Sequence, residues 1–260
     1  MNAMIELADQ EWWLVRDLFD PRGRRGVPAR YPRRRMVEAI LFLARTGCRC
    51  YLPERYPPWS AVWQQWRRWR ANGVWERAMA RLARLIRRRA KRKHVEPTMV
   101  MIDAQTVRGG RAGPTFHNAG GRGGRTIGAK RSILIEYLGL PLALRVDPAR
   151  PHDVKVGREL LASGLKDLPL VRDVIADRGY RGLAALAARR QVTLNIKAPL
   201  KGSTGFVPLA PLYKVEHAFA RLGRWRRLSR GYEGTEASAK AWLEVACVAY
   251  LFARWRIEPA

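Results

Sequence analysis

Three carboxylates stand where the pattern of this 260-residue chain makes metal chemistry possible. Asp103 ends the apolar run 98–103 and Asp177 ends the run 170–177, and both runs are typical of strands buried on both faces. Glu216 stands at the entrance of a helical pattern over 213–233. If the two strands are neighbours, both aspartates emerge at one edge of the sheet, where a packed helix can bring Glu216 beside them.

Carboxylates gathered in this way repel one another and raise each other's pKa unless a divalent metal ion is bound between them. Ligation by oxygen alone suits Mg²⁺ or Mn²⁺ rather than zinc. Two such ions about 4 Å apart activate a nucleophilic oxygen and stabilise the leaving oxygen of a phosphodiester displacement. The acids therefore predict metal-dependent chemistry on a nucleic acid backbone.

A simpler interpretation of Glu216 stays open at this point. The residues that follow it are basic for three turns, and an acid in a first helical turn is favoured by the helix dipole alone. A set of three acids chosen from 22 Asp and Glu residues is also weak evidence by itself. The acids need support from elsewhere in the chain.

The composition limits the class of partner and the cellular compartment. Lys and Arg number 50 against 22 Asp and Glu, a net charge of +28 that predicts a polyanionic partner, nucleic acid first, and both sides of residue 95 are basic. Cys48, Cys50 and Cys247 are too few and too scattered for a disulfide framework or a zinc site. No apolar run approaches the roughly 20 residues of a membrane span, and the acidic start is unlike a signal peptide. We expect a cytoplasmic protein.

The first part of the chain predicts a helical domain over residues 1–95. Trp59, Trp63 and Trp66 share one helical face, which is more typical of a core than of a base-stacking platform, while Arg67 and Arg68 lie on other faces. Helices with short connections and basic faces are compatible with a helix-turn-helix-like module that binds DNA. The basic run 87–93 is either a solvated helix end or a DNA-contacting face. The expected helices are 9–19, 33–47, 59–70 and 74–93.

The second part predicts a mixed sheet flanked by helices, a domain over residues 96–260. The Gly- and Arg-rich segment 107–128 has neither the spacing of a P-loop nor that of a dinucleotide-binding turn, so a nucleotide cradle is rejected. The expected strands are 98–103, 131–137, 141–146, 170–177 and 192–197, and the expected helices are 151–165, 182–190, 213–233 and 237–256.

Several segments, taken together, resemble a known family. IDAQTV, GAKRSILIEYLG, VIADRGYRG and YKVEHAFARLGRWRRLSRGYE, in this order, are similar to the DDE transposases of bacterial insertion sequences, in the insertion sequence five group. LFLARTGCRCYLPERYPPWSAVWQQWRRWRANGVWE resembles that family's helical N-terminal region, so the resemblance covers nearly the whole chain. It implies an RNase H-like α/β catalytic domain with a mixed five-stranded sheet, in which Asp103, Asp177 and Glu216 match the family's metal-binding acids.

The resemblance also implies a function, cofactors and partners. The expected protein is a transposase that binds the ends of its insertion element and catalyses metal-dependent DNA strand cleavage and strand transfer. Its expected cofactors are two Mg²⁺ ions, with Mn²⁺ as a substitute. Its expected partners are double-stranded DNA, both the terminal inverted repeats and the target, and a second copy of the chain when DNA is bound. We expect it in the bacterial cytoplasm, associated with the nucleoid.

Carried over by position, several residues become expected DNA contacts. Arg178 and Tyr180 match the loop after the second acid, and Arg224 and Arg227 match basic positions after the third. On an unbroken helix, Arg227 would lie on nearly the same face as Glu216.

The chain departs from the family pattern near the third acid and in one strand. Leu212 replaces an expected arginine, His217 follows Glu216 where arginine is usual, and Lys214 or His217 is the expected substitute contact. The family segment GRKRH…DT reads GAKRS…EY at 128–137, which affects substrate contacts there. Two alternatives remain: a catalytically inactive transposase relative that binds DNA, and an RNA-binding protein, which would leave the acid-ended strands unexplained.

Overall fold

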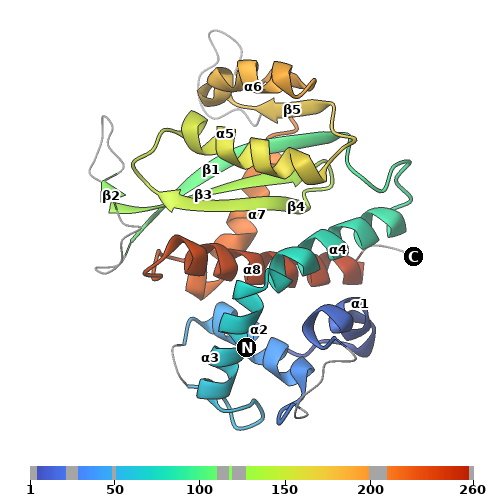
Figure 1. The fold of residues 1–260 in the computed structure, drawn as a ribbon, viewed down its shortest axis with the longest axis vertical. Coiled ribbons are helices and arrows are strands. Elements are labelled where there is room, and N and C mark those ends of the chain that lie inside the picture. The colour runs from blue at the N-terminus through green and yellow to red at the C-terminus, as the bar shows by residue number, and fades with distance from the viewer. Residues whose placement is uncertain are drawn as a thin grey trace.

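The computed structural model describes residues 5–21, 29–48, 51–109, 117–118, 127–198 and 210–257. Helices form one end of the molecule and a mixed sheet forms the other, with α4 and α8 packed side by side between them (Figure 1). The first helices are α1 (Asp9–Phe19), α2 (Arg33–Thr46), α3 (Trp59–Ala71) and α4 (Val74–Arg89). The later ones are α5 (Asp153–Gly164), α6 (Ala184–Arg189), α7 (Tyr213–Gly223) and α8 (Glu236–Ile257), with single-turn or short 3₁₀ segments η1 (Leu165–Asp167), η2 (Arg178–Leu183) and η3 (Arg226–Leu228).

The sheet has five main strands in the order β4-β3-β1-β5-β6. The first three are antiparallel to one another, whereas β5 runs parallel to β1 and β6 runs parallel to β5. A two-residue strand, β2, pairs with the start of β3. This is the RNase H-like arrangement that the sequence predicted. The strands are β1 (Met99–Arg108), β2 (His117–Asn118), β3 (Ile127–Glu136), β4 (Pro141–Pro148), β5 (Asp173–Ala176) and β6 (Thr193–Ile196).

The two faces of the sheet bury separate cores. The face that carries Met101 and Ile133 packs with α7, α8 and the first helices, and the face that carries Val100 and Ile102 packs with α5. The first of these cores is continuous across residue 95, because α8 contacts both α2 and α4. The N-terminal helices are thus anchored on the same core as the face of the sheet that carries Met101 and Ile133.

The predicted tryptophan stripe packs on the core, with Trp66 buried and Trp59 and Trp63 half-buried. Trp63 stacks on Trp66 with ring centroids 4.8 Å apart, and Trp66 stacks on Trp242 of α8 at 4.7 Å. Trp66 is only 1% exposed, so its ring has no free face for a base. The basic residues of α3 are left on the outside, where Arg67 and Arg68 are exposed.

A buried ion pair joins the helical part to the sheet. Arg87 of α4 donates to the carboxylate of Glu136 at the end of β3, and Glu136 is completely buried. The same guanidinium donates to the carbonyl oxygens of His94 and Val95, at 2.8 and 2.7 Å. Because Arg87 draws the following segment back on itself, α4 ends at Arg89, earlier than the expected 93.

Other expected boundaries were also wrong, among them the starts of β3, at Ile127 rather than 131, and of β5, at Asp173 rather than 170. β1 does not end at Asp103 but continues to Arg108, because residues 104–108 still pair with β3 after the shorter β5 has ended at Ala176. The helix expected over 213–233 ends at Gly223, and the next two apolar side chains, Trp225 and Leu228, turn into the core. Because the helix ends at Gly223, the arginines that follow it do not continue along the face that carries Glu216.

Of the helices in the described ranges, none combines the length and apolar character needed to cross a bilayer. Cys48 and Cys247 are free thiols, as expected for a chain without a disulfide framework, and Cys50 lies outside the described residues. Most of the Gly- and Arg-rich segment 107–128 and part of the loop 21–32 also lie outside them.

Candidate active site

Asp103 lies on β1, and Asp177 directly follows the parallel strand β5. Met101 pairs with Ile175 at the end of the β1–β5 ladder, and each aspartate stands two residues beyond that pair. Because side chains alternate along a strand, both aspartates belong to the face that carries Met101 and Ile175. The carboxylates therefore lie close together at the point where the parallel pairing of β1 and β5 ends, although β1 itself continues.

Backbone amides hold one oxygen of each aspartate. The N–H of Ala104 donates to Asp103 Oδ1 at 2.7 Å, and the N–H of Gly179 donates to Asp177 Oδ1 at 2.8 Å. The second contact also caps η2, so that the turn after β5 and the carboxylate orient each other. Each aspartate is thus fixed by local structure before any ligand binds.

Glu216 approaches from α7, which packs on the same face of the sheet. The helix buries Val215, Ala218 and Phe219 in the core that includes Met101, and it contacts β1 and α8 (Figure 1). Glu216 lies on the outer side of this helix and is exposed. Its carboxylate is therefore free to reach a ligand from solvent without losing packing.

The electrostatics show that the acids share one neighbourhood. The pKa of Asp103 is raised from its ordinary 3.8 to about 7, mainly by burial; the charges of Asp177, Asp153 and Glu216 act in the same direction, and the hydrogen bond from Ala104 opposes them. Asp153, at the start of α5, was not predicted to belong to this site. Its position at a helix entrance was visible in the sequence, but nothing there placed it beside Asp103.

The pKa of Asp103 predicts how metal-free protein responds to pH. Because the folded-state pKa is above the unfolded value, protonated Asp103 stabilises the fold below about pH 4, and this stabilisation is lost as the pH rises through about 7. In EDTA, urea unfolding should show a loss of about 2 kcal/mol between about pH 5 and 8 from this group. Asp103→Asn, which cannot ionise, should flatten that slope, and an unchanged slope would contradict the assignment.

The donor set fits a hard divalent cation by charge and by ligand type. The neighbouring buried cation, Lys130, pairs with Asp153 at 2.5 Å and donates to the Pro151 carbonyl at 2.6 Å, instead of neutralising Asp103. Within the part of the chain that the structure describes, no three His, Cys, Asp or Glu side chains are close enough to enclose a metal ion. Among the described residues the carboxylates are therefore neighbours that do not form a closed cage.

The residues expected to contact DNA divide into exposed and buried groups. Arg178, which follows Asp177 in the chain, and Arg224, at the end of α7, are exposed. Lys214 lies over the Tyr137 ring at 4.5 Å, and His217 meets the Tyr213 ring edge-on at 5.4 Å between centroids. Arg67 and Arg68 lie on α3, among the N-terminal helices rather than beside the acids.

Two of the expected DNA contacts do not fit their positions. The side chain of Tyr180 is 2% exposed, so its ring has no surface to offer to DNA. Arg227 is turned inward, where it forms an ion pair with Glu233 at 2.7 Å and stacks over Trp242 at 4.7 Å. Arg227 was expected on the face of Glu216 because the helix was expected to continue without a break. The helix ends at Gly223, so this reason no longer holds.

A buried arginine, Arg131, fixes the segment that follows α7. It lies on the acid-bearing face of the sheet, and its guanidinium donates to the carbonyl oxygens of Leu228 and Arg230 at 2.6 and 3.4 Å. Burial lowers its pKa to about 10, which leaves it charged. The sequence placed Arg131 within a substrate-contacting motif, whereas the structure gives it a packing role between sheet and arginine segment.

Arg131→Lys is expected to lower the free energy of unfolding by about 1–2 kcal/mol, because a single ammonium replaces a fork that reaches two carbonyl groups. The measurement is the urea midpoint at constant slope. Arg224→Lys, an exposed position on the same segment, is the matched control and should leave the midpoint unchanged. Equal effects of the two variants would argue against the packing role.

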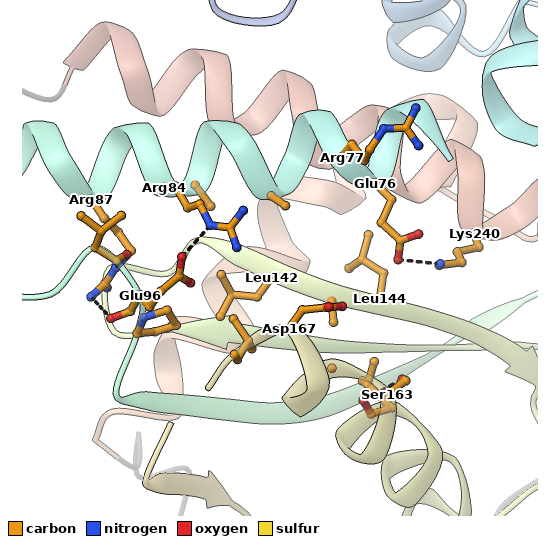
Figure 2. A pocket seen from close by; sticks show the side chains of 18 residues that line it. Glu76, Arg77, Arg84, Arg87, Glu96, Leu142, Leu144, Ser163, Asp167 and Lys240 are labelled. Carbon is orange, nitrogen blue, oxygen red and sulfur yellow. Dashed lines mark hydrogen bonds and ion pairs between the residues drawn. The ribbon is translucent and has the colours of Figure 1, made fainter. Parts of the chain in front are cut away.

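The cleft in Figure 2 is separate from the acids. It has a volume of about 460 Å³ and lies between α4, β4 and α5. Four of its charged side chains already form ion pairs: Arg84 pairs with Glu96 at 2.6 Å, and Lys240 pairs with Glu76 at 3.0 Å. A polar ligand would have to break these contacts, so the cleft is a weaker candidate site than the acids.

Comparisons with known proteins agree with the predicted family. Residues 7–79 match a family model described as a transposase of the IS4/5 family, and residues 94–205 match a model described as a transposase DDE domain. The second match includes Asp103 and Asp177 and ends before Glu216. A comparison with curated protein sequences found no match.

Two solved structures overlap with the chain. The Mos1 strand transfer complex has 13% sequence identity and a TM-score of 0.35, covering 91% of this chain and 79% of that chain. The Mos1 transposase paired-end complex with the left transposon end has 12% identity and a TM-score of 0.31, covering 91% and 80%. At TM-scores this low, neither overlap carries a conclusion about the chain.

The two family models cover most of the helical part and most of the strand-bearing part of the chain. Transposase DDE domains generally depend on a divalent metal, in agreement with the oxygen donors found here. This chain is a DNA-cleaving and strand-transferring enzyme, and it belongs to the DDE transposases of the IS4/5 family.

Proposed function

We propose that Asp103, Asp177 and Glu216 are the metal-binding acids of this transposase and that they hold two Mg²⁺ ions, for which Mn²⁺ can substitute. The observation that carries the proposal is the level placement of Asp103 and Asp177 on one face of the sheet, under the helix that presents Glu216. The raised pKa of Asp103 supports it, because a site built for a divalent cation is electrostatically strained without one.

In the proposed mechanism the ions, when bound, activate the attacking oxygen and stabilise the leaving oxygen of an in-line displacement at phosphorus. The chain itself positions the carboxylates that would bind the ions. Amides of Ala104 and Gly179 fix one oxygen of each aspartate, which leaves the other oxygen for the metal. Glu216 closes the site from the solvent side. The first reaction hydrolyses a strand at the element end, and the freed 3′-OH then attacks target DNA.

The proposed partner is double-stranded DNA, both the terminal inverted repeats of the element and the target. The charge of +28 supplies the attraction to phosphate. Arg178, Arg224 and Lys214 are proposed to contact the backbone near the cut, while the helical part, residues 1–95, binds the element end with Arg67 and Arg68. The proposed active assembly is a homodimer on DNA, working at the nucleoid in the bacterial cytoplasm.

The proposal is tested with the full chain and a labelled duplex that carries the element end. We expect a nick that leaves a 3′-OH at the element boundary in Mg²⁺ or Mn²⁺, no nick in EDTA, and no nick on a scrambled end. Joining of that 3′ end to a target plasmid should follow. Cleavage that persists in EDTA would contradict the metal mechanism.

A further inference from the structure

One side of α3 is exposed along the whole length of the helix. The residues on this side recur at intervals of three and four positions, so they share one helical face, and each of them is exposed: Ser60, Gln64, Arg67, Arg68 and Ala71. The opposite side is buried, and its Trp66 ring stacks on Trp242 of α8. The helix is therefore fixed on the core by one face and presents a polar, basic face to solvent.

The charges on α3 are not neutralised, unlike those on the other N-terminal helices. Asp9 of α1 pairs with Arg34 of α2, and Asp17 of α1 pairs with Arg81 of α4. In contrast, α3 contains no acid, and none of the ion pairs between described residues includes one of its arginines. A helix face that meets only solvent commonly mixes charges of both signs. The exposed face of α3 is thus left open for an anionic partner.

A groove of about 640 Å³ lies between this face and the start of α2. Ser60, Gln64 and Arg68 line it from α3, and Arg33 lines it from α2. The Arg33 guanidinium donates to Gln65 Oε1 at 2.7 Å, and Gln65 is only 7% exposed, so a buried amide holds this arginine at the groove. The described residues that line the groove include no Asp or Glu. The groove therefore offers fixed positive charge beside the exposed face of α3.

The side chains on this face have the chemistry that reads base pairs. The major groove of B-DNA is about 12 Å wide and admits an α-helix, and the 13 residues of α3 span about 20 Å. A glutamine amide, as in Gln64, can form two hydrogen bonds with adenine, and an arginine, as in Arg68, can form two with guanine. Because these two residues are four positions apart, they can contact neighbouring base pairs from one side of the helix.

We propose that α3 enters the major groove of the element end and reads its sequence through Gln64 and Arg68, while Arg33 binds the phosphate backbone beside the helix. The inference rests on the proposed function, in which the helical part of the chain binds the element end. It adds the side chains that select the sequence, as distinct from those that supply attraction to any duplex.

The test compares binding of the full chain to an element-end duplex and to a scrambled duplex of the same composition, by mobility shift at fixed salt. We expect Gln64→Ala and Arg68→Ala each to reduce the preference for the element end about 5–100-fold, the range for loss of one bidentate base contact. Because Gln64 is uncharged, Gln64→Ala should leave the affinity for the scrambled duplex unchanged. Arg33→Gln should weaken binding to both duplexes equally.

Two controls separate base reading from loss of charge or of fold. Arg189→Ala removes an exposed charge on α6, at the opposite end of the molecule from α3 (Figure 1), and it should retain the wild-type preference. A loss of preference equal to that of Arg68→Ala would overturn the proposal. Gln64→Ala should unfold at the wild-type temperature, because the position is exposed and alanine favours a helix.

Single base-pair substitutions across the element end locate the contacts. At one adenine the wild type should discriminate while Gln64→Ala does not, and at one guanine the same should hold for Arg68→Ala. If the wild type prefers the element end and both variants keep its full preference, reading by α3 is overturned while the proposed function stands. If the wild type itself shows no preference, the proposed binding of the element end fails, and the role of α3 fails with it.

Discussion

Asp103→Ala is expected to reduce Mg²⁺-dependent cleavage of element-end DNA by about 10³-fold or more, equivalent to at least about 4 kcal/mol of transition-state stabilisation. The physical reason is that Asp103 is a proposed metal ligand on the same face of the sheet as Asp177, beneath α7, so its loss removes one carboxylate from the proposed site. Asp177→Ala and Glu216→Ala should have effects of the same order, because the three acids act as one unit.

DNA binding should survive these substitutions. Removing a carboxylate from a chain with a net charge of +28 removes repulsion toward phosphate, so affinity should be unchanged or higher. Cleavage is measured on end-labelled duplex, and binding by mobility shift at fixed salt. Asp167→Ala, an exposed acid on η1, is the control that should keep wild-type cleavage. Mg²⁺-dependent cleavage retained by Asp103→Ala would refute the assignment of the acids.

Breaking the buried pair between Arg87 and Glu136 is expected to cost about 3–5 kcal/mol of unfolding free energy. Glu136 is completely buried, and the Leu138 N–H also donates to it at 2.7 Å. Burial raises the pKa of Glu136 against the opposing charge of Arg87. Arg87→Met therefore leaves a carboxylate without its cation in the place where the helical part joins the sheet.

The double variant Arg87→Met with Glu136→Gln provides the matched control. It removes both charges, so it should recover much of the stability lost in Arg87→Met alone. Urea unfolding at neutral pH measures all three proteins. If Arg87→Met lowers the free energy of unfolding by less than about 1 kcal/mol, which is the range of a surface ion pair, the pair does not stabilise the contact between the helical part and the sheet.

Much of the fold could be predicted because local periodicity determines it. The helix at 9–19 was placed at its observed bounds, and the end of α2 was marked by Gly47, whose φ of +70° favours glycine. Apolar runs likewise identified all five main strands. The ends of elements were harder: β1 continues past Asp103 only because β3 lies alongside it, and a strand partner cannot be read from the strand's own residues.

The sequence by itself determined the family, through a resemblance that the family models confirm, and it supplied the three candidate acids and the large excess of basic residues. These depend on residue type and spacing, which any reader of the chain can see. Only the tertiary structure decided which basic and polar residues face outward. Arg224 is exposed while Arg227 pairs with Glu233, and Tyr180 lies under α5 instead of on DNA. The reason is physical: burial and pairing arise from contacts between segments far apart in the sequence, so composition and periodicity cannot assign them.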